Sequence, residues 1–265
     1  MGSAQITRLI PPTSTAVRTF TVREGQGRRI VDACDEFPYR ALVLVLSPAF
    51  GPSTGFLYGP DMVATAGHCV NTGEGVWIPI DGKYPLRVGF RTRIDEPYRW
   101  CNPTRLYAAH EWAHGGDERF DYGAIRLDRE IGRELGWFDL APGERERIGR
   151  DACVIGYGMR PWQEIQSRLD FDVVPYIGNG SMRDELDGQL FYDARTDKGM
   201  SGGPVCVRQE DGWRVAAIHA MAAHPDEALP EPHRLYSHGT TISREVFENL
   251  MLWREEKRAD REGPP

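Results

Sequence analysis

The apolar residues of this chain come in short runs, which limits the folds open to it. The longest uninterrupted run extends only from Ala41 to Leu46, far below the roughly 20 residues that a membrane-spanning helix needs. The 265 residues include 29 glycines and 19 prolines, and such residues between apolar runs mark tight turns. Many short strands joined by turns are typical of antiparallel barrels and sandwiches. We therefore predict an all-β fold that does not enter a membrane.

The predicted strands are short, and several alternate apolar and polar residues as half-buried strands do. They are Arg40 to Ser47, Gly55 to Tyr58, Met62 to Thr65, Pro85 to Arg91, Arg105 to Ala109, Tyr122 to Leu127, Ala152 to Gly156, Leu190 to Asp193, Pro204 to Val207 and Trp213 to Ala220. One helix is predicted from Ser243 to Lys257, with Ser243 as its N-cap. Its apolar stripe is expected to be packing surface and comprises Val246, Phe247, Leu250, Met251 and Trp253.

The charge and the cysteine content argue against several kinds of partner and site. The formal net charge is −7, without a dense Lys/Arg cluster, whereas a nucleic-acid-binding protein needs a basic face. The five cysteines are an odd, scattered set without a Cys-x-x-Cys pair, namely Cys34, Cys69, Cys101, Cys153 and Cys206. We expect reduced thiols, no nucleic-acid partner, no cysteine zinc site and no cofactor. The polar start carries no apolar signal-peptide core, and the compartment and oligomeric state stay open.

Three short segments contain residues suited to nucleophilic catalysis. They read Thr65-Ala-Gly-His68-Cys69, Asp121-Tyr-Gly-Ala-Ile-Arg-Leu127 and Gly199-Met-Ser201-Gly-Gly-Pro204. A serine hydroxyl needs an adjacent base to take its proton, and that base needs a partner that fixes its tautomer. We therefore predict Ser201 as the nucleophile, His68 as the general base and Asp121 as the residue that orients the histidine.

The glycines around Ser201 indicate an oxyanion hole. The backbone N–H groups of Gly199 and Ser201 are predicted to face the oxygen that becomes negative in the tetrahedral intermediate. Loss of one such donor costs about 10²- to 10³-fold in rate, which explains a backbone conformation that glycine adopts cheaply. Taken singly, the three segments also have ordinary interpretations: a structural histidine, an aspartate that opens a strand, and a plain turn.

In the order His, Asp, Ser, the three segments resemble the triad segments of the trypsin-like (chymotrypsin-fold) serine peptidases. Other segments look like the bacterial glutamyl endopeptidase (V8-like) branch, and they are Phe37-Pro-Tyr-Arg-Ala41, Gly55-Phe-Leu-Tyr-Gly-Pro60, Val63-Ala-Thr-Ala-Gly-His-Cys-Val70, Ile131-Gly-Arg-Glu-Leu-Gly-Trp-Phe138 and Ile242-Ser-Arg-Glu-Val-Phe-Glu-Asn-Leu250. The similarity runs over most of Phe37 to Trp253. It implies two six-stranded antiparallel β-barrels packed face to face, a site between them, a C-terminal α-helix, and endopeptidase activity on protein or peptide substrates without a cofactor.

This resemblance also divides the chain. The expected parts are an N-terminal extension over residues 1–36, a first barrel over 37–135, a second barrel over 145–242, the helix over 243–257 and a flexible tail over 258–265. The polar stretch Asp128 to Asp151 is the natural connection between the two halves. The extension is interpreted as a propeptide or a docking arm.

In the glutamyl endopeptidase branch, a threonine five residues before the catalytic serine and a histidine on the following strand bind a glutamate side chain of the substrate. Thr196 and His219 stand at the matching positions, and Arg195 and Lys198 lie nearby in the sequence. Hydroxyl, imidazole and cationic groups can all donate hydrogen bonds to a carboxylate. The resemblance thus implies a preference for Glu on the acyl side of the cut. The alternative is that His219 is a wall residue and both cations are solvated.

The chain departs from the family pattern at its predicted activation site. Met200 precedes the nucleophile, where animal trypsin-like enzymes have an aspartate that pairs with a newly cut N-terminus. The segment Arg29-Ile30-Val31 resembles their cleavage site but lacks this acidic partner, so we predict that no such cleavage is needed. Cys69 also lacks its usual partner, because the matching place reads Pro52-Ser-Thr54.

Three competing functions stay open. His110-Glu-Trp-Ala-His114 matches the zinc-protease helix motif, and Glu134 would then be a third ligand. Gly199 to Gly203 also resembles the nucleophile elbow of α/β-hydrolases, but Gly202-Gly203-Pro204 is a poor start for the helix that must follow. The last alternative is a catalytically idle protease-like module that binds a partner.

Overall fold

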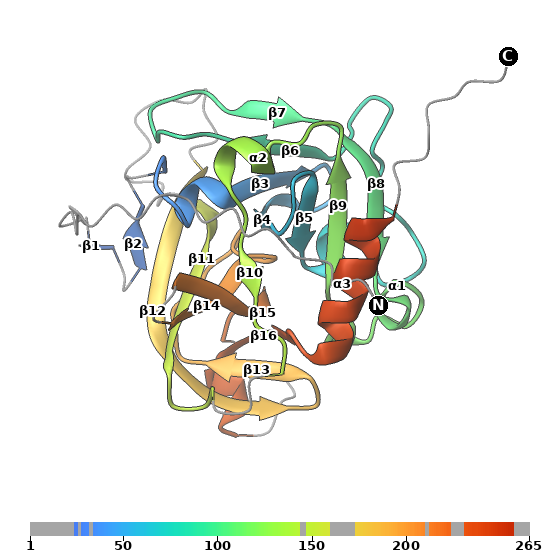
Figure 1. The fold of residues 1–265 in the computed structure, drawn as a ribbon. Coiled ribbons are helices and arrows are strands. Elements are labelled where there is room, and N and C mark those ends of the chain that lie inside the picture. The colour runs from blue at the N-terminus through green and yellow to red at the C-terminus, as the bar shows by residue number, and fades with distance from the viewer. Residues whose placement is uncertain are drawn as a thin grey trace, which may run out of the picture.

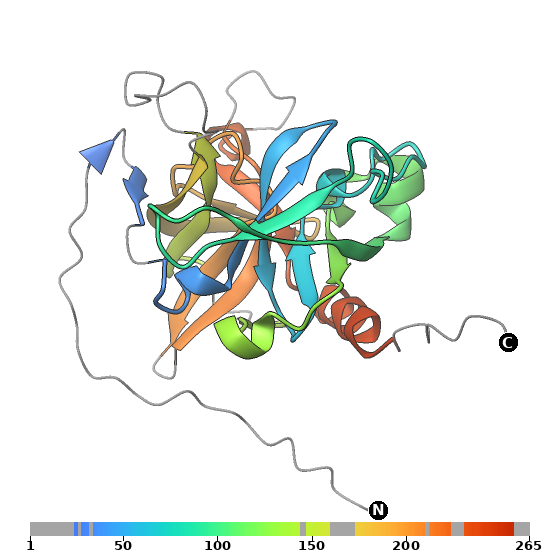
Figure 2. The same cartoon turned by 90° about the horizontal axis from the view of Figure 1, so that it is seen from above.

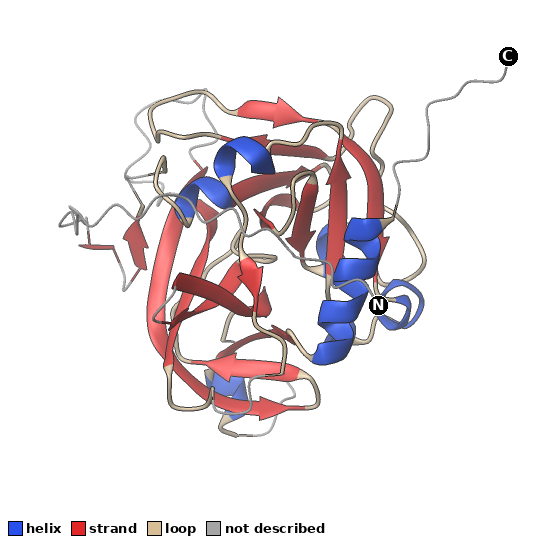
Figure 3. Cartoon of the chain, viewed as in Figure 1, coloured by secondary structure: helices blue, strands red, loops and turns tan. Residues whose placement is uncertain are grey.

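The computed structural model describes residues 24–25, 28–31, 34–143, 147–159, 173–209, 212–223 and 231–256. Within these ranges strands dominate, and the longest helix follows the last strand (Figure 3). The all-β class with a C-terminal helix is therefore confirmed. Most of the predicted extension and the whole predicted tail lie outside the described residues. None of the described helices is long and apolar enough to cross a membrane.

The first sheet is closed by one bent strand. It contains β3 Leu42–Ser47, β4 Gly51–Leu57, β5 Met62–Thr65, β6 Arg87–Phe90, β7 Arg99–Cys101, β8 Pro103–Ala108 and β9 Gly123–Leu127. Its order is β7-β6-β3-β4-β5-β9-β8, so the two edges are successive strands that only Asn102 separates. Asn102 N–H donates to Asp128 Oδ1 at 3.2 Å, and Asp128 N–H donates to Asn102 O at 3.0 Å. The sheet has seven strands. If β7 and β8 are taken as one bent strand, it has the six strands that were expected for the first barrel.

The second sheet forms a complete ring. It contains β11 Asp151–Met159, β12 Val173–Leu186, β13 Gln189–Tyr192, β14 Pro204–Gln209, β15 Gly212–Met221 and β16 Ser237–Thr241. The order β12-β11-β14-β15-β16-β13 returns to its start because β13 also pairs with β12. The short β1 Glu24–Gly25 and β2 Arg28–Ile30 extend the sheet beyond β12, and β10 Asp139–Leu140 pairs with β15. Figure 1 shows this barrel below the first one.

Two strands of the second barrel are absent from the sequence prediction. β16 reads Ser-His-Gly-Thr-Thr, yet all of its residues are buried. β12 contains glycines at points of close backbone approach, and a Cβ added to Gly178 would lie 2.1 Å from the carbonyl oxygen of Arg195. Both strands form because their backbones pair with and closely approach other strands of the closed barrel. Their sequences do not alternate apolar and polar residues clearly, which explains why they were not predicted.

The C-terminal helix α3 spans Arg244–Glu255, so it ends two residues before the predicted end at Lys257, which lies outside the described residues. Ser243 is its N-cap as predicted, because Ser243 Oγ accepts the Val246 N–H at 3.1 Å. In the predicted apolar stripe, Val246 and Leu250 are fully buried, while Phe247, Met251 and Trp253 are half-buried against the same core. The stripe is therefore confirmed as packing surface.

The helix α3 packs on the first barrel although it follows the second one in sequence. Tyr58 OH donates to the Leu250 carbonyl oxygen at 3.2 Å, and Asn249 Nδ2 donates to Tyr122 OH at 2.7 Å. Both views place α3 beside β9 (Figures 1 and 2). The end of the chain thus completes the wall of the first barrel.

The remaining helices are short. The α-helices are α1 His110–Gly115 and α2 Gly132–Leu135, and the 3₁₀ turns are η1 Tyr39–Ala41, η2 Gly67–Cys69, η3 Glu118–Phe120 and η5 His233–Leu235. The five cysteines are buried, and none of them forms a disulfide with another described residue. Cys153 and Cys206 are register partners on β11 and β14, 4% and 0% exposed, so both thiols lie in the core.

Candidate active site

His68 and Asp121 come together because they follow and precede paired strands. His68 lies in η2 just after β5, and Asp121 lies just before β9, while β5 and β9 pair with Thr65 opposite Gly123. His68 Nδ1 is 2.7 Å from Asp121 Oδ2, and the backbone N–H of His68 donates to Asp121 Oδ1 at 2.8 Å. One carboxylate therefore fixes both the ring and the backbone of the histidine.

The surroundings of His68 favour its charged form. Burial alone lowers the pKa of His68, but the Asp121 carboxylate and the Cys69 thiol outweigh burial and raise the pKa well above its usual value. The ring of Trp112 packs edge-on to the His68 ring, with the centroids 6.2 Å apart. Trp112 Nε1 donates to the Asn71 carbonyl oxygen at 3.1 Å, which holds this wall in place.

Ser201 lies on a loop that is hydrogen-bonded to the first barrel. Thr54 on β4 donates twice to this loop, from Oγ1 to the Gly199 carbonyl oxygen at 2.8 Å and from its backbone N–H to the Ser201 carbonyl oxygen at 2.8 Å. Ser201 Oγ itself donates to the carbonyl oxygen of Ala220 at 3.1 Å. The Cys69 thiol, which follows His68, lies 4.0 Å from the Ser201 carbonyl oxygen. The loop of Ser201 therefore borders the turn that carries His68.

The backbone around Ser201 leaves two amides without acceptors. Gly199 has a φ of +98° and Gly202 a φ of +83°, in the region that favours glycine. Gly202 N–H donates to the His219 carbonyl oxygen at 2.7 Å, and Met200 N–H donates to the Asp197 carbonyl oxygen at 3.0 Å. Within the described part of the chain, the N–H groups of Gly199 and Ser201 donate to no acceptor. They are the two groups predicted to bind an oxyanion.

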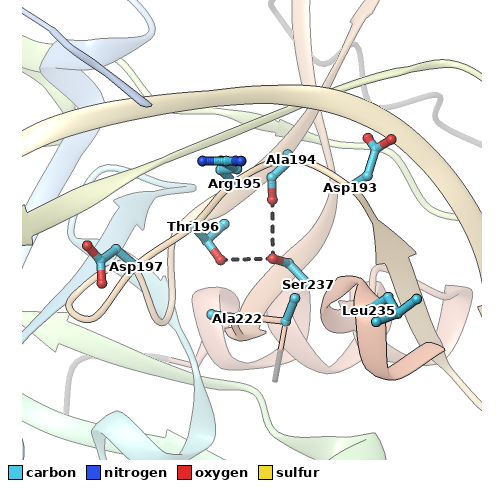
Figure 4. Close-up of a pocket in the computed structure, with 9 residues that line it drawn as sticks. Asp193, Ala194, Arg195, Thr196, Asp197, Ala222, Leu235 and Ser237 are labelled. Atoms are coloured by element: carbon cyan, nitrogen blue, oxygen red, sulfur yellow. Dashed lines mark hydrogen bonds between the residues drawn. The ribbon is translucent and has the colours of Figure 1, made fainter. Parts of the chain in front are cut away.

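A cavity of about 430 Å³ opens beside this loop (Figure 4). Its lining comprises Asp193, Ala194, Arg195, Thr196, Asp197, Ala222, Ala223, Leu235 and Ser237. Thr196 Oγ1 lies 3.0 Å from Ser237 Oγ, which also donates to the Ala194 carbonyl oxygen at 3.2 Å. Of the four residues predicted to bind substrate, Thr196 and Arg195 line this cavity, whereas His219 and Lys198 are outside its lining.

Charges of both signs surround the cavity. Arg183 pairs with Asp193, and the Ser181 N–H also donates to this carboxylate at 2.6 Å. Burial alone raises the pKa of Asp193, but these hydrogen bonds outweigh burial and lower it. Asp197 is exposed and accepts the backbone N–H of Lys198 at 2.7 Å. Of the two carboxylates in the lining, Asp193 therefore already has a cationic partner.

His219 occupies a position unlike that of His68. It is 1% exposed on β15, and its Nδ1 lies 2.6 Å from Tyr192 OH on β13. Burial, followed by the nearby His238 and His68, lowers the pKa of His219 to about 3. The imidazole is therefore neutral at neutral pH and forms part of the barrel wall.

Sequence reasoning missed Ser237, Tyr192 and the carbonyl of Ala220. Ser237 opens β16, a strand that the apolar pattern did not reveal. Ala220 ends the predicted strand Trp213 to Ala220, and Tyr192 is the second-last residue of the predicted strand Leu190 to Asp193, so their place near strand ends was the available signal. Their partners come from distant parts of the chain, 27 residues from Tyr192 to His219 and 19 from Ala220 to Ser201.

The zinc-protease motif lies on α1, away from any third ligand that was predicted. His110 and His114 are both exposed. Glu134 lies on α2 and pairs with Arg99 at 2.9 Å, and Figures 1 and 2 place α1 and α2 well apart. Glu134 is therefore not a ligand beside these histidines. Among the described residues, no group of three or more His, Cys, Asp or Glu side chains is arranged to hold a metal ion.

The segment that resembles an activation site is part of the second sheet. Ile30 pairs with Tyr176 on β12, and the Val31 N–H donates to the Pro175 carbonyl oxygen at 2.9 Å. Met200 is buried in the same apolar cluster that Ile30 packs against. The apolar Met200 thus lies in the cluster that the apolar Ile30 contacts. That the protein needs no cleavage at this segment stays a prediction.

Comparison with known proteins places this arrangement in a family. Residues 53–218, which include His68, Asp121 and Ser201, match the model of the trypsin-like peptidase domain. A glutamyl endopeptidase of Bacillus licheniformis is 29% identical over 224 residues, which cover 82% of this chain and 64% of that protein. An extracellular metalloprotease of Bacillus subtilis is 28% identical over 234 residues, which cover 85% of this chain and 67% of that protein. The aligned region is thus less than two thirds of the Bacillus licheniformis relative.

Solved structures share the fold. A Glu endopeptidase in complex with MPD superposes with a TM-score of 0.67 at 18% identity, covering 89% of this chain and 100% of that chain. The thermostable serine protease AL20 from an extremophilic microorganism superposes with a TM-score of 0.59 at 17% identity, covering 82% and 96%. The family match extends over more than half of the sequence, and the fold agrees with it. The chain therefore belongs to the trypsin-like peptidase family.

Proposed function

We propose that this protein is a serine endopeptidase that hydrolyses protein or peptide substrates through an acyl-enzyme intermediate. The observation that carries the proposal is the double hydrogen bond from His68 to Asp121, at 2.7 and 2.8 Å, beside the loop of Ser201. Membership of the trypsin-like peptidase family supports the same chemistry.

In the proposed reaction, the Ser201 hydroxyl turns from the Ala220 carbonyl oxygen toward His68. His68 takes the proton while Ser201 Oγ attacks the peptide carbonyl carbon. The N–H groups of Gly199 and Ser201 bind the oxyanion that forms. His68 then gives the proton to the leaving amine, and water repeats the sequence to release the acid. Asp121 stays ionised and stabilises the imidazolium.

A fluorophosphonate that labels activated serines tests the proposal. The full chain is expected to react at Ser201, with the modified residue identified by mass spectrometry. Ser201→Ala should abolish labelling, and His68→Ala should slow it strongly while both variants keep their circular dichroism spectrum. A folded wild-type chain that does not react would indicate an idle binding module. Hydrolysis that a chelator abolishes and the fluorophosphonate does not would instead indicate a metalloprotease.

We further propose that the 430 Å³ cavity accepts the substrate side chain on the acyl side of the cut and prefers a carboxylate. Thr196, Ser237 and Arg195 are among its lining residues, and hydroxyl and guanidinium groups can donate to a carboxylate. The neutral His219 adds no charge, so Arg195 carries the electrostatic part of this preference.

Selectivity between Glu and Gln substrates measures that preference. A hydrogen bond to a charged group contributes about 1.5–3 kcal/mol, so Arg195→Gln should lower the Glu/Gln ratio of kcat/KM by roughly 10- to 100-fold. Lys198→Gln is the matched control, because Lys198 is exposed and outside the cavity lining, and it should leave the ratio unchanged. If the wild-type protein cuts a diverse peptide mixture after residues other than Glu, the proposed peptidase activity stands and the proposed carboxylate preference of the cavity is wrong.

A further inference from the structure

The helix α1 carries two histidines that the proposed peptidase mechanism does not use. His110 and His114 are one helical turn apart, and both side chains are exposed. Their ring centroids are 4.7 Å apart. Side chains at positions i and i+4 of a helix lie on the same face, so the two imidazoles face the solvent side by side.

The spacing of the rings suits a shared metal ion. Imidazole nitrogen binds such an ion at about 2.0–2.1 Å, which places the ion about 3.1–3.2 Å from each ring centre. Two ring centres 4.7 Å apart then subtend roughly 95–100° at the ion, between the square-planar and tetrahedral angles. The separation of the two ring centres is therefore compatible with both rings binding one ion.

The backbone that carries the two histidines is held in place. Gly116, with a φ of +60°, caps the helix and donates to the carbonyl oxygens of Glu111 and Trp112. On the inner side, Ala113 is buried, and its carbonyl oxygen accepts the Gly75 N–H at 2.6 Å. Trp112 is anchored to Asn71 as described above. Such preorganisation lowers the entropic cost of binding an ion.

The other described histidines already have partners or are buried. His68 is held by Asp121, and His233 Nε2 lies 2.7 Å from Asp184 Oδ2. His219 and His238 are 1% and 3% exposed. Within the described part of the chain, His110 and His114 are therefore the histidine pair that a metal ion in solution can reach.

We propose that His110 and His114 form a surface chelate site for a late first-row divalent ion, with Cu²⁺ bound more tightly than Ni²⁺ or Zn²⁺. Imidazole suits these ions, and the expected order of affinity follows the Irving–Williams series. Because the described residues supply no third ligand, water completes the coordination. The site lies on the outer side of the helix whose inner side contacts His68, and it takes no part in the hydrolysis.

Calorimetric titration of the full chain with Cu²⁺ and Zn²⁺ tests the site. Ser201→Ala serves as the background, so that no autolysis occurs, and His110→Gln, His114→Gln and Glu111→Gln are compared in it. Loss of either imidazole converts a chelate into a single contact, so each His variant should bind about 10²-fold more weakly. Glu111→Gln, next to His110 on the same exposed turn, should bind as the background does. Electron paramagnetic resonance of the Cu²⁺ form should show coupling to two nitrogens, and to one in each His variant.

If both His110→Gln and His114→Gln retain the metal affinity of the background chain, the ion is bound elsewhere and the proposal is wrong. It is also overturned if the background chain binds Cu²⁺ no more tightly than the variants do. Unchanged melting temperatures of the metal-free variants exclude a loss of folding as the cause, since both side chains are exposed.

Discussion

A histidine of each barrel lies near the Ser201 loop, His68 in the first and His219 in the second, and the two have opposite electrostatic environments. Burial alone lowers the pKa of both His68 and His219. In the first barrel a carboxylate, Asp121, reverses the effect and raises the pKa of His68 well above its usual value. In the second barrel, burial, followed by His238 and His68, lowers the pKa of His219 to about 3. The ring contacts the hydroxyl of Tyr192, and no described carboxylate is among the causes of this pKa shift. The chemistry of the partner therefore decides whether a buried imidazole can hold a proton.

This difference separates two tasks. His68 must gain and lose a proton in the proposed reaction, and the carboxylate stabilises the charged form that it passes through. His219 lies in a continuous wall of hydrogen-bonded strands, where a charge would have no partner. In the environment of His219, His68 would lack the carboxylate that stabilises its charged form. An imidazolium at the position of His219 would be an unpaired charge in the barrel core, which is costly in free energy.

The largest effect is expected from Asp121→Asn, which removes the carboxylate that distinguishes His68 from His219. Turnover should fall by about 10⁴-fold because the histidine loses its tautomer and its charge partner. The pKa of His68 should fall with it, so the acid limb of the kcat/KM profile should move to lower pH. Asp95→Asn, at an exposed carboxylate paired with Arg93, is the control. Activity within tenfold of the wild type would show that Asp121 does not orient the base.

The pH dependence of stability tests the other histidine. The unfolded chain protonates His219 near pH 6.5 and the folded chain only near pH 3, so the unfolded state binds more protons in this window. The contribution of His219 to stability is therefore complete above pH 6.5 and decreases as the pH falls toward 3, by up to about 5 kcal/mol. Urea unfolding at several pH values should show this slope, and it should be weaker in His219→Gln. His110→Gln, at an exposed site, should keep the slope. Equal slopes in His219→Gln and the wild type would contradict a neutral buried imidazole.

A smaller effect is expected from Tyr192→Phe. The change removes the hydroxyl 2.6 Å from His219 Nδ1 and leaves a buried nitrogen without its partner, at a cost of about 1–3 kcal/mol in the free energy of unfolding. Burial is the main cause of the low pKa of His219, so the shape of the pH–stability curve should persist. A curve that flattens in Tyr192→Phe would assign the low pKa to the hydroxyl instead.

The smallest effect is expected from Trp112→Phe, beside His68. The change removes the Nε1 donor to the Asn71 carbonyl oxygen, which contributes about 1 kcal/mol to stability. The hydrogen bonds from His68 to Asp121 remain, so kcat/KM should change by less than about tenfold. A larger loss would show that the Trp112 wall positions the base as much as the carboxylate does.

Local patterns were sufficient to predict that His68 and Asp121 lie together. His68 and Asp121 end or begin apolar strands, and their residue types and order predicted a contact that the structure contains. Gly199 was predicted from the need for an unusual backbone conformation, and its φ is +98°. Most strands of the first barrel were also predicted from short apolar runs, whereas β7 Arg99–Cys101 was not.

Features that depend on barrel closure could not be read from the pattern. β16 has no alternation to detect, although it supplies Ser237 to the cavity. Thr196 and His219 match the family positions equally well, yet they differ in environment because Tyr192 approaches only His219. Burial and hydrogen-bond partners across 27 residues of sequence are properties of the assembled barrel.

The two barrels exchange segments, which has a consequence for how the molecule unfolds. β10 leaves the first barrel but pairs with β15 of the second, with Asp139 opposite Arg214. α3 leaves the second barrel but is held by the first, where Arg126 Nη2 donates to the Trp253 carbonyl oxygen at 2.6 Å. Unfolding of either barrel would therefore break contacts that hold a segment of the other barrel. Heating should therefore produce one cooperative transition, with equal calorimetric and van't Hoff enthalpies, instead of two separate events.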